Sequence, residues 1–113
     1  MKISVFGLGY VGCVTVGCLS HFGHSIIGVD INEDKLKTIN SGRATVVENG
    51  LDKLIKSGIN NGLIKATKDL SFAIKNTEMA IICVGTPNDK NGLLDMQYVN
   101  KLIKKIASEI HNK

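Results

Sequence analysis

Short apolar segments alternate along this chain with segments of helical periodicity. The apolar segment at 2–6 contains β-branched residues and ends at Gly7, which is typical of a buried strand. From Val11 to Phe22 the period changes, and apolar residues recur three or four positions apart, as on one buried stripe of a helix. The predicted stripe consists of Val11, Val14, Thr15, Cys18, Leu19 and Phe22, with Gly23 at the C-terminal cap. The first elements are therefore a strand, a tight glycine loop and a helix.

A second strand and helix follow in the same order. The strand covers 25–29 and is closed by Asp30, and Asn32 is placed to cap a helix that ends at Gly42. Further on, the pattern predicts helices at 51–58, 70–75 and 99–110 and strands at 63–67 and 79–84. The strand at 79–84 is unbroken in its apolar character, which favours burial on both faces. Asp95 can cap the last helix.

The alternation of strands and helices predicts the fold class. Right-handed crossovers place such strands in an α/β, Rossmann-type parallel sheet with helices on both faces and strand order 3-2-1-4. The sheet is incomplete, because a fifth strand would begin where the sequence stops at Lys113. The fourth strand would then form a long apolar edge. We therefore expect either a shortened chain, which is not a complete enzyme, or a homodimer paired through that edge.

Composition excludes several other functions. The 113 residues suffice for one hydrophobic core, so we expect a single domain over residues 1–113. The net charge of +4 comes from lysines interleaved with acids, which argues against nucleic-acid binding. The N-terminal segment resembles neither a signal peptide nor a membrane span, and three cysteines without metal-ligand spacing fit a reducing cytosol. We expect a cytoplasmic protein with no metal site and no catalytic constellation of its own.

The candidate chemistry lies in the glycine loop. Gly7, Gly9 and Gly12 form a G-x-G-x-x-G pattern between a predicted strand and a predicted helix. In such a loop the first glycine allows the sharp turn, the second lets a pyrophosphate approach the backbone, and the third lets the helix lie close to the sheet. The free N–H groups and the positive end of the helix dipole then suit an anion. Alone, this pattern is a weak signal that also fits a simple tight connection.

Asp30 makes the pattern specific. It ends the next strand, 18 residues beyond Gly12, where a carboxylate can accept hydrogen bonds from the adenosine ribose. Its charge would repel the 2′-phosphate of NADP, so the predicted cofactor is NAD. Lys35 and Thr86, which follow the second and fourth strands, are further candidate contacts. The alternatives are a helix-capping role for Asp30, a plain surface lysine at Lys35 and a turn hydroxyl at Thr86.

Three segments together resemble a known family. FGLGYVG at 6–12, GHSIIGVD at 23–30 and ICVGTPNDKNGLLDMQYV at 82–99 are similar to the N-terminal part of the UDP-glucose and GDP-mannose 6-dehydrogenases, and the last segment is closer to the GDP-mannose branch. The resemblance implies a four-electron oxidation of a sugar nucleotide with two NAD⁺, through a thiohemiacetal on a cysteine outside this chain. It places Tyr10, Val11, Asp30, Lys35 and Thr86 at the NAD. The nucleotide sugar would bind the missing C-terminal part, so this chain alone would be inactive.

The sequence departs from this family in one loop. The family usually has prolines on both sides of the acid at Glu48, whereas this chain has Val47 and Asn49 there, which should loosen the loop. UDP-glucose is the alternative substrate within the family. Two other interpretations remain. The chain could be a stand-alone NAD-sensing module like the regulatory domains of potassium channels, or a remnant that no longer binds the cofactor.

Overall fold

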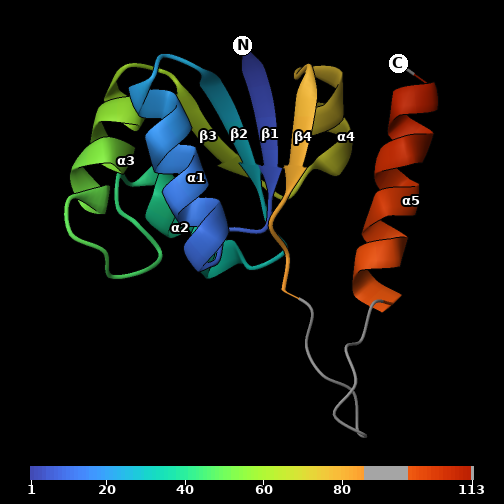
Figure 1. Cartoon of the computed structure of the whole chain (residues 1–113), viewed down its shortest axis with the longest axis horizontal. Coiled ribbons are helices and arrows are strands. Elements are labelled where there is room, and N and C mark those ends of the chain that lie inside the picture. The colour runs from blue at the N-terminus through green and yellow to red at the C-terminus, as the bar shows by residue number, and fades with distance from the viewer. Residues whose placement is uncertain (86–96, 113) are drawn as a thin grey trace, which may run out of the picture.

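The computed structural model describes residues 1–85 and 97–112; the first range holds four strands and four helices and the second a single helix (Figure 1). The elements are β1 (Lys2–Phe6), α1 (Tyr10–His21), β2 (Ser25–Val29), α2 (Glu33–Asn40), α3 (Leu51–Asn60), β3 (Ile64–Thr67), α4 (Leu70–Lys75), β4 (Met79–Ile82) and α5 (Gln97–His111). All the elements predicted from the sequence are present. The predicted cap at Asp95 lies outside the described residues.

The four strands form one parallel sheet in the order β3-β2-β1-β4, as predicted. Ile3 of β1 lies between Ile26 of β2 and Met79 of β4, and Ile26 pairs with Ile64 of β3. Since all strands point the same way, their carboxyl ends meet at one edge. The glycine loop and Asp30 both follow strands at this edge, so the fold brings them together.

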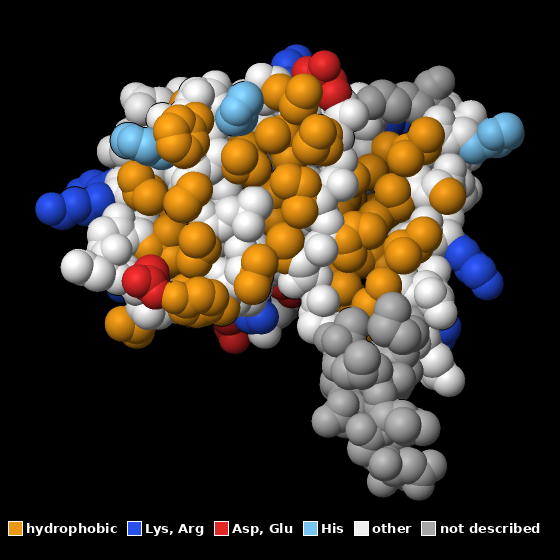
Figure 2. Space-filling view, in the orientation of Figure 1, with side chains coloured by type: hydrophobic (Ala, Val, Ile, Leu, Met, Phe, Trp, Pro, Cys, Tyr) orange, Lys and Arg blue, Asp and Glu red, His pale blue; other side chains and the backbone are white. Residues whose placement is uncertain are grey.

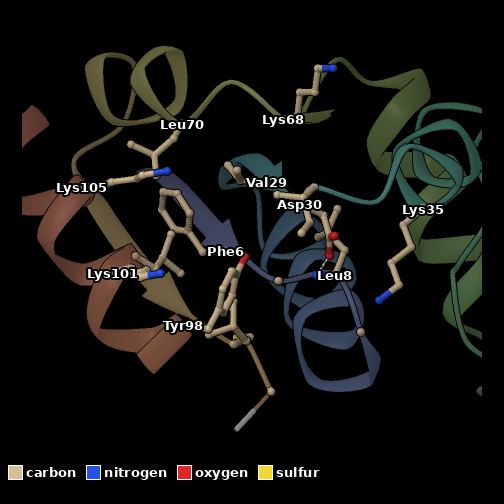
Figure 3. Close-up of a pocket in the computed structure, with 17 residues that line it drawn as sticks. Phe6, Leu8, Val29, Asp30, Lys35, Lys68, Leu70, Tyr98, Lys101 and Lys105 are labelled. Atoms are coloured by element: carbon tan, nitrogen blue, oxygen red, sulfur yellow. Dashed lines mark hydrogen bonds between the residues drawn. The ribbon is translucent and has the colours of Figure 1, made fainter. Parts of the chain in front are cut away.

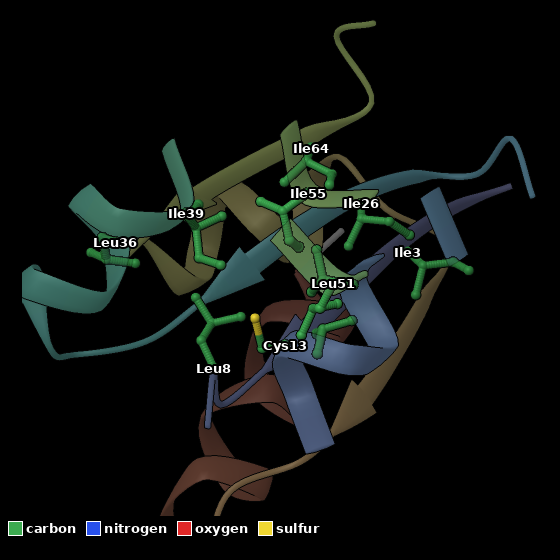
Figure 4. Packing of buried hydrophobic residues seen from close by; sticks show 12 residues of the cluster. Ile3, Leu8, Cys13, Ile26, Leu36, Ile39, Leu51, Ile55 and Ile64 are labelled. Atoms are coloured by element: carbon green, nitrogen blue, oxygen red, sulfur yellow. The ribbon is translucent and has the colours of Figure 1, made fainter. Parts of the chain in front are cut away.

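The sheet separates two hydrophobic clusters. On one face, Ile3 and Val5 of β1 pack with residues of α1, α2 and α3, among them Cys13, Ile39 and Ile55 (Figure 4). On the other face, Phe6 of β1 packs with residues of α4 and α5. Alternate residues of one strand thus face opposite clusters, which is the geometry of a sheet covered by helices on both sides.

The buried face of α1 differs from the prediction. The buried residues are small ones, namely Gly12, Cys13, Val16, Gly17 and Ser20. Of the predicted stripe, Val11 is 63% exposed, Phe22 is 76% exposed and Cys18 is also exposed, and hydrophobic side chains gather on the face of the molecule that carries α1 (Figure 2). The helix is apolar almost all round, so its period does not identify the inner face. Close packing identifies the inner face, because a Cβ on Gly17 would lie 2.7 Å from Leu51 of α3.

The prediction for β4 was wrong in its burial. Met79 is 45% exposed and Ile82 is 38% exposed. The strand lies at the edge of the sheet, where α4 and α5 cover it only in part. On α5, Val99 and Ile106 are buried, whereas Ile103 and Ile110 are exposed. None of the helices in the described ranges is long and apolar enough to cross a membrane.

Candidate functional site

The glycine loop is a tight turn fixed at both ends. Gly7 has a φ of +100°, and a Cβ there would lie 2.9 Å from backbone atoms of Cys83 and Val84. Its N–H donates to the Val29 carbonyl at 2.8 Å. Leu8 then turns its fully buried side chain into the core against Gly28, which is expected to stabilise the turn by roughly 1.5–3 kcal/mol. Contacts within the protein therefore set the shape of the loop.

Gly9 and Gly12 have different surroundings. A Cβ on Gly9 would meet no atom within 4 Å, so this side of the loop is open. A Cβ on Gly12 would lie 1.7 Å from the Gly7 carbonyl oxygen, so the third glycine closes the loop on itself. The same Cβ would lie 3.5 Å from Cβ of Cys83, just after β4, which agrees with the expected close approach of the helix to the sheet.

The first turn of α1 is suited to an anion. Its N-cap, Gly9, provides no side-chain hydrogen bond, and the turn contains no acidic residue. The first N–H groups of a helix have no partner within the helix and carry the positive end of its dipole. The open side of Gly9 therefore leads to backbone donors that a phosphate group can reach.

Asp30 connects the loop to the second helix. One carboxylate oxygen, Oδ2, accepts from the Leu8 N–H at 2.8 Å, and Oδ1 accepts from the Asn32 N–H at 2.9 Å. The cap of α2 is Asn32, whose side chain accepts from the N–H groups of Asp34 and Lys35 at 2.9 and 3.2 Å. The structure therefore assigns helix capping to Asn32, and the lone pairs of Asp30 that remain are available to a ligand.

A pocket of about 600 Å³ opens at this edge of the sheet (Figure 3). Gly7, Gly9, Asp30 and Lys35 line it, as the sequence led us to expect. Tyr10, Val11 and Gly12 lie just beyond, in the first turn of α1, and are not in its lining. Thr86 lies outside the described residues.

Several lining residues were not predicted from the sequence. They include Phe6, Lys68, Leu70, Tyr98, Lys101, Leu102 and Lys105, which come from β1, α4, α5 and the turn before α4. The spacing of Tyr98, Lys101, Leu102 and Lys105 on a helix could have indicated one shared face. The sequence does not show that this face lines the same pocket as the glycine loop, because that arrangement depends on how α5 packs against α4.

The segment between α2 and α3 is tied to the glycine loop. Thr45 donates through its hydroxyl to the Leu8 carbonyl at 2.8 Å, and its N–H donates to Sγ of Cys13 at 3.5 Å. The Tyr10 hydroxyl donates to the Glu48 carboxylate. This carboxylate raises the pKa of Tyr10, since a phenolate would lose the hydrogen bond and be repelled. Although it lacks the family's prolines, the segment is thus held by three hydrogen bonds.

The three cysteines differ in their surroundings. Cys83 lines the pocket, but partial burial raises the pKa of its thiol and keeps it protonated. Cys13 is buried, and Cys18 is exposed on α1. Over residues 1–85 and 97–112, no group of three or more His, Cys, Asp or Glu side chains could hold a metal ion.

Known proteins resemble this chain over its whole length. The model of the UDP-glucose/GDP-mannose dehydrogenase family, NAD binding domain, matches residues 1–113. A GDP-mannose 6-dehydrogenase of Pseudomonas savastanoi pv. phaseolicola is 45% identical over 100% of this chain and 26% of its own length. A UDP-glucose 6-dehydrogenase of Rhizobium meliloti is 36% identical over 97% of this chain and 25% of its own length. The chain thus spans about a quarter of these relatives.

Solved structures agree with these relatives. A ternary complex of GDP-mannose dehydrogenase from Pseudomonas aeruginosa matches with a TM-score of 0.97 and 44% identity, over 100% of this chain and 26% of that one. A UDP-glucose dehydrogenase from Pyrobaculum islandicum matches with a TM-score of 0.92 and 29% identity, over 99% of this chain and 26% of that one. The chain belongs to the UDP-glucose/GDP-mannose dehydrogenase family, and the region it represents is the NAD binding domain of that family.

Proposed function

We propose that the pocket at the carboxyl edge of the sheet binds NAD through the residues predicted from the sequence. Gly7, Gly9 and Gly12 shape the loop, and backbone N–H groups at Tyr10 and Val11 meet the pyrophosphate. Asp30 accepts from the ribose hydroxyls, with Lys35 and Thr86 as further contacts. The observation that carries this proposal is the bond from the Leu8 N–H to Asp30, which fixes the carboxylate beside the open side of Gly9. Bound NAD would supply the hydride acceptor of the reaction.

The same site favours NAD over NADP. A 2′-phosphate would approach the Asp30 carboxylate, whose position is set by two backbone hydrogen bonds. Of the nearby lysines, Lys68 already pairs with Glu33 at 3.0 Å. Among the described residues that line this side of the pocket, this leaves Lys35 to offset the repulsion of the extra phosphate.

Calorimetry with NAD and NADP tests this proposal. Wild type should bind NAD and give a much smaller signal with NADP, and Asp30→Ala should lose about tenfold or more in NAD affinity because charge-assisted hydrogen bonds to the ribose disappear. Asp34→Ala is the matched control, since it removes the same charge from a position outside the pocket lining. Equal NAD affinity in wild type and Asp30→Ala would contradict the proposed role.

We further propose that the whole enzyme oxidises the C6 alcohol of GDP-mannose to GDP-mannuronate with two NAD⁺. The greater identity to a GDP-mannose 6-dehydrogenase, 45% against 36% for a UDP-glucose 6-dehydrogenase, supports GDP-mannose over the alternative, UDP-glucose. Assays of NADH formation with both nucleotide sugars on the full-length enzyme distinguish them. The 113-residue chain alone should form no NADH with either.

Three properties of the chain complete the proposal. Residues 1–113 form a single domain, supported by one sheet shared between the two hydrophobic clusters. A cytoplasmic location is supported by three cysteines that are all unpaired. A homodimer through the edge of β4 is supported by the partly exposed Met79 and Ile82.

A further inference from the structure

The NAD pocket has a second wall that the glycine loop does not supply. It consists of Tyr98, Lys101, Leu102 and Lys105, which lie three or four positions apart on the first turns of α5. Figure 3 shows Lys101 and Lys105 on the α5 side of the pocket and Asp30 and Lys35 on the other. The pocket therefore lies between the glycine loop, at Gly7 to Gly9, and a basic face of α5.

The charges of this pocket are unbalanced. Four lysines line it, but Asp30 is its only lining acid among the described residues. Lys68 pairs with Glu33, whereas Lys101 and Lys105 make no ion pair with any residue in the described ranges. Two positive charges thus lie on the α5 wall without a carboxylate to offset them.

Packing does not account for these two lysines. The buried side chains Val99 and Ile106 hold α5 in place, and Glu109 accepts from the Ser71 hydroxyl of α4 at 2.7 Å. Lys101 and Lys105 are four positions apart on one helix, where like charges repel. An anionic ligand in the pocket would relieve this repulsion.

The cofactor supplies such an anion. The pyrophosphate of NAD carries two negative charges, and the glycine loop opposite α5 meets it with backbone dipoles only. Lysine ammonium groups on flexible four-carbon stems can turn toward such a group from the other wall. We propose that Lys101 and Lys105 bind the adenosine diphosphate half of NAD through their charge. This inference rests on the proposed function of the pocket.

The double variant K101Q/K105Q tests the inference. We expect about fivefold weaker NAD binding at low ionic strength and a smaller loss at about 0.5 M salt, where charges are screened over a few ångström. ADP should show the same loss, and adenosine, which has no phosphate, should show none. The conservative variant K101R/K105R should restore the affinity because it retains both charges. Binding is measured by calorimetry, and thermal unfolding confirms that each variant is folded.

The matched control is K104Q/K53Q. It also removes two lysine charges, one from α5 itself, but neither residue lines the pocket. Equal losses of NAD affinity in the two double variants would show an effect of net charge and would overturn the inference. A loss of affinity in K101Q/K105Q that is the same at low and high salt would also overturn it. In both results wild type still binds NAD, so the proposed function stands. A wild-type chain that binds no NAD would overturn the proposed function together with this inference.

Discussion

The three glycines of the loop differ in what a side chain would meet. We predict that Gly9→Ala changes the free energy of unfolding by less than about 0.5 kcal/mol, since its Cβ meets nothing within 4 Å. Gly12→Ala should lower the free energy of unfolding by about 1–3 kcal/mol or more, since the added Cβ would lie 1.7 Å from the Gly7 carbonyl oxygen. Both variants should lose NAD binding. Urea unfolding and calorimetry check this, and equal stability of the two variants would contradict it.

Residue spacing predicted the positions of the site but not their contacts. The glycine pattern and Asp30 define a turn and a strand end, and both lie where the sequence places them. The bond from the Leu8 N–H to Asp30 was not predictable, because it depends on the side-by-side placement of β1 and β2. The contact of Gly12 with the Gly7 carbonyl was missed for a similar reason, since local spacing does not tell which atom faces a missing Cβ.

At the scale of elements, the hydrogen bond between Tyr10 and Glu48 joins α1 to the segment before α3. This bond raises the pKa of Tyr10 in the folded state. The stability that it gives the fold is therefore fully present below the unfolded pKa of 10.0, and it is lost as the pH rises through the higher folded pKa. In a Tyr98→Phe background, absorbance at about 295 nm follows Tyr10 alone. We predict that Glu48→Gln returns the pKa of Tyr10 toward its ordinary value.

Glu78→Gln is the control for this titration. It removes a carboxylate whose hydrogen bond is to the N–H of Lys2, at the other end of β1. The pKa of Tyr10 should not change in this variant. An identical titration with Gln and Glu at position 48 would show that the segment is not held at this point.

Element boundaries followed from the sequence better than element faces. Strand ends at Gly7 and Asp30 and the cap at Asn32 are set by local chemistry, and the structure has them there. The inner face of α1 was wrongly predicted, because small residues at Gly17 and Cys13 allow close approach to α3 and the sheet. Periodicity measures apolar character and does not measure how near two backbones can come.

At the scale of the whole molecule, β4 is one of the two edge strands of the described sheet. Strand order was predictable because right-handed crossovers leave few arrangements for four parallel strands. The same order placed β4 at an edge, but the expected burial of both its faces was wrong, since an apolar run has the same sequence whether helices cover its strand fully or only in part. Ile82, 38% exposed, lies on this edge strand, whereas Ile103, 46% exposed, lies on α5.

These two isoleucines allow a matched test of the proposed dimer. If two copies pair through their β4 edges, Ile82→Lys should shift the chain to monomer by adding a charge to the paired strand, while Ile103→Lys should leave it a dimer. Sedimentation velocity at several concentrations measures the association, and hydrogen exchange should show faster exchange of β4 amides in Ile82→Lys only. A wild-type chain that stays monomeric at high concentration would contradict the dimer. Dissociation by Ile103→Lys alone would place the interface on α5, because only that helix carries the added charge.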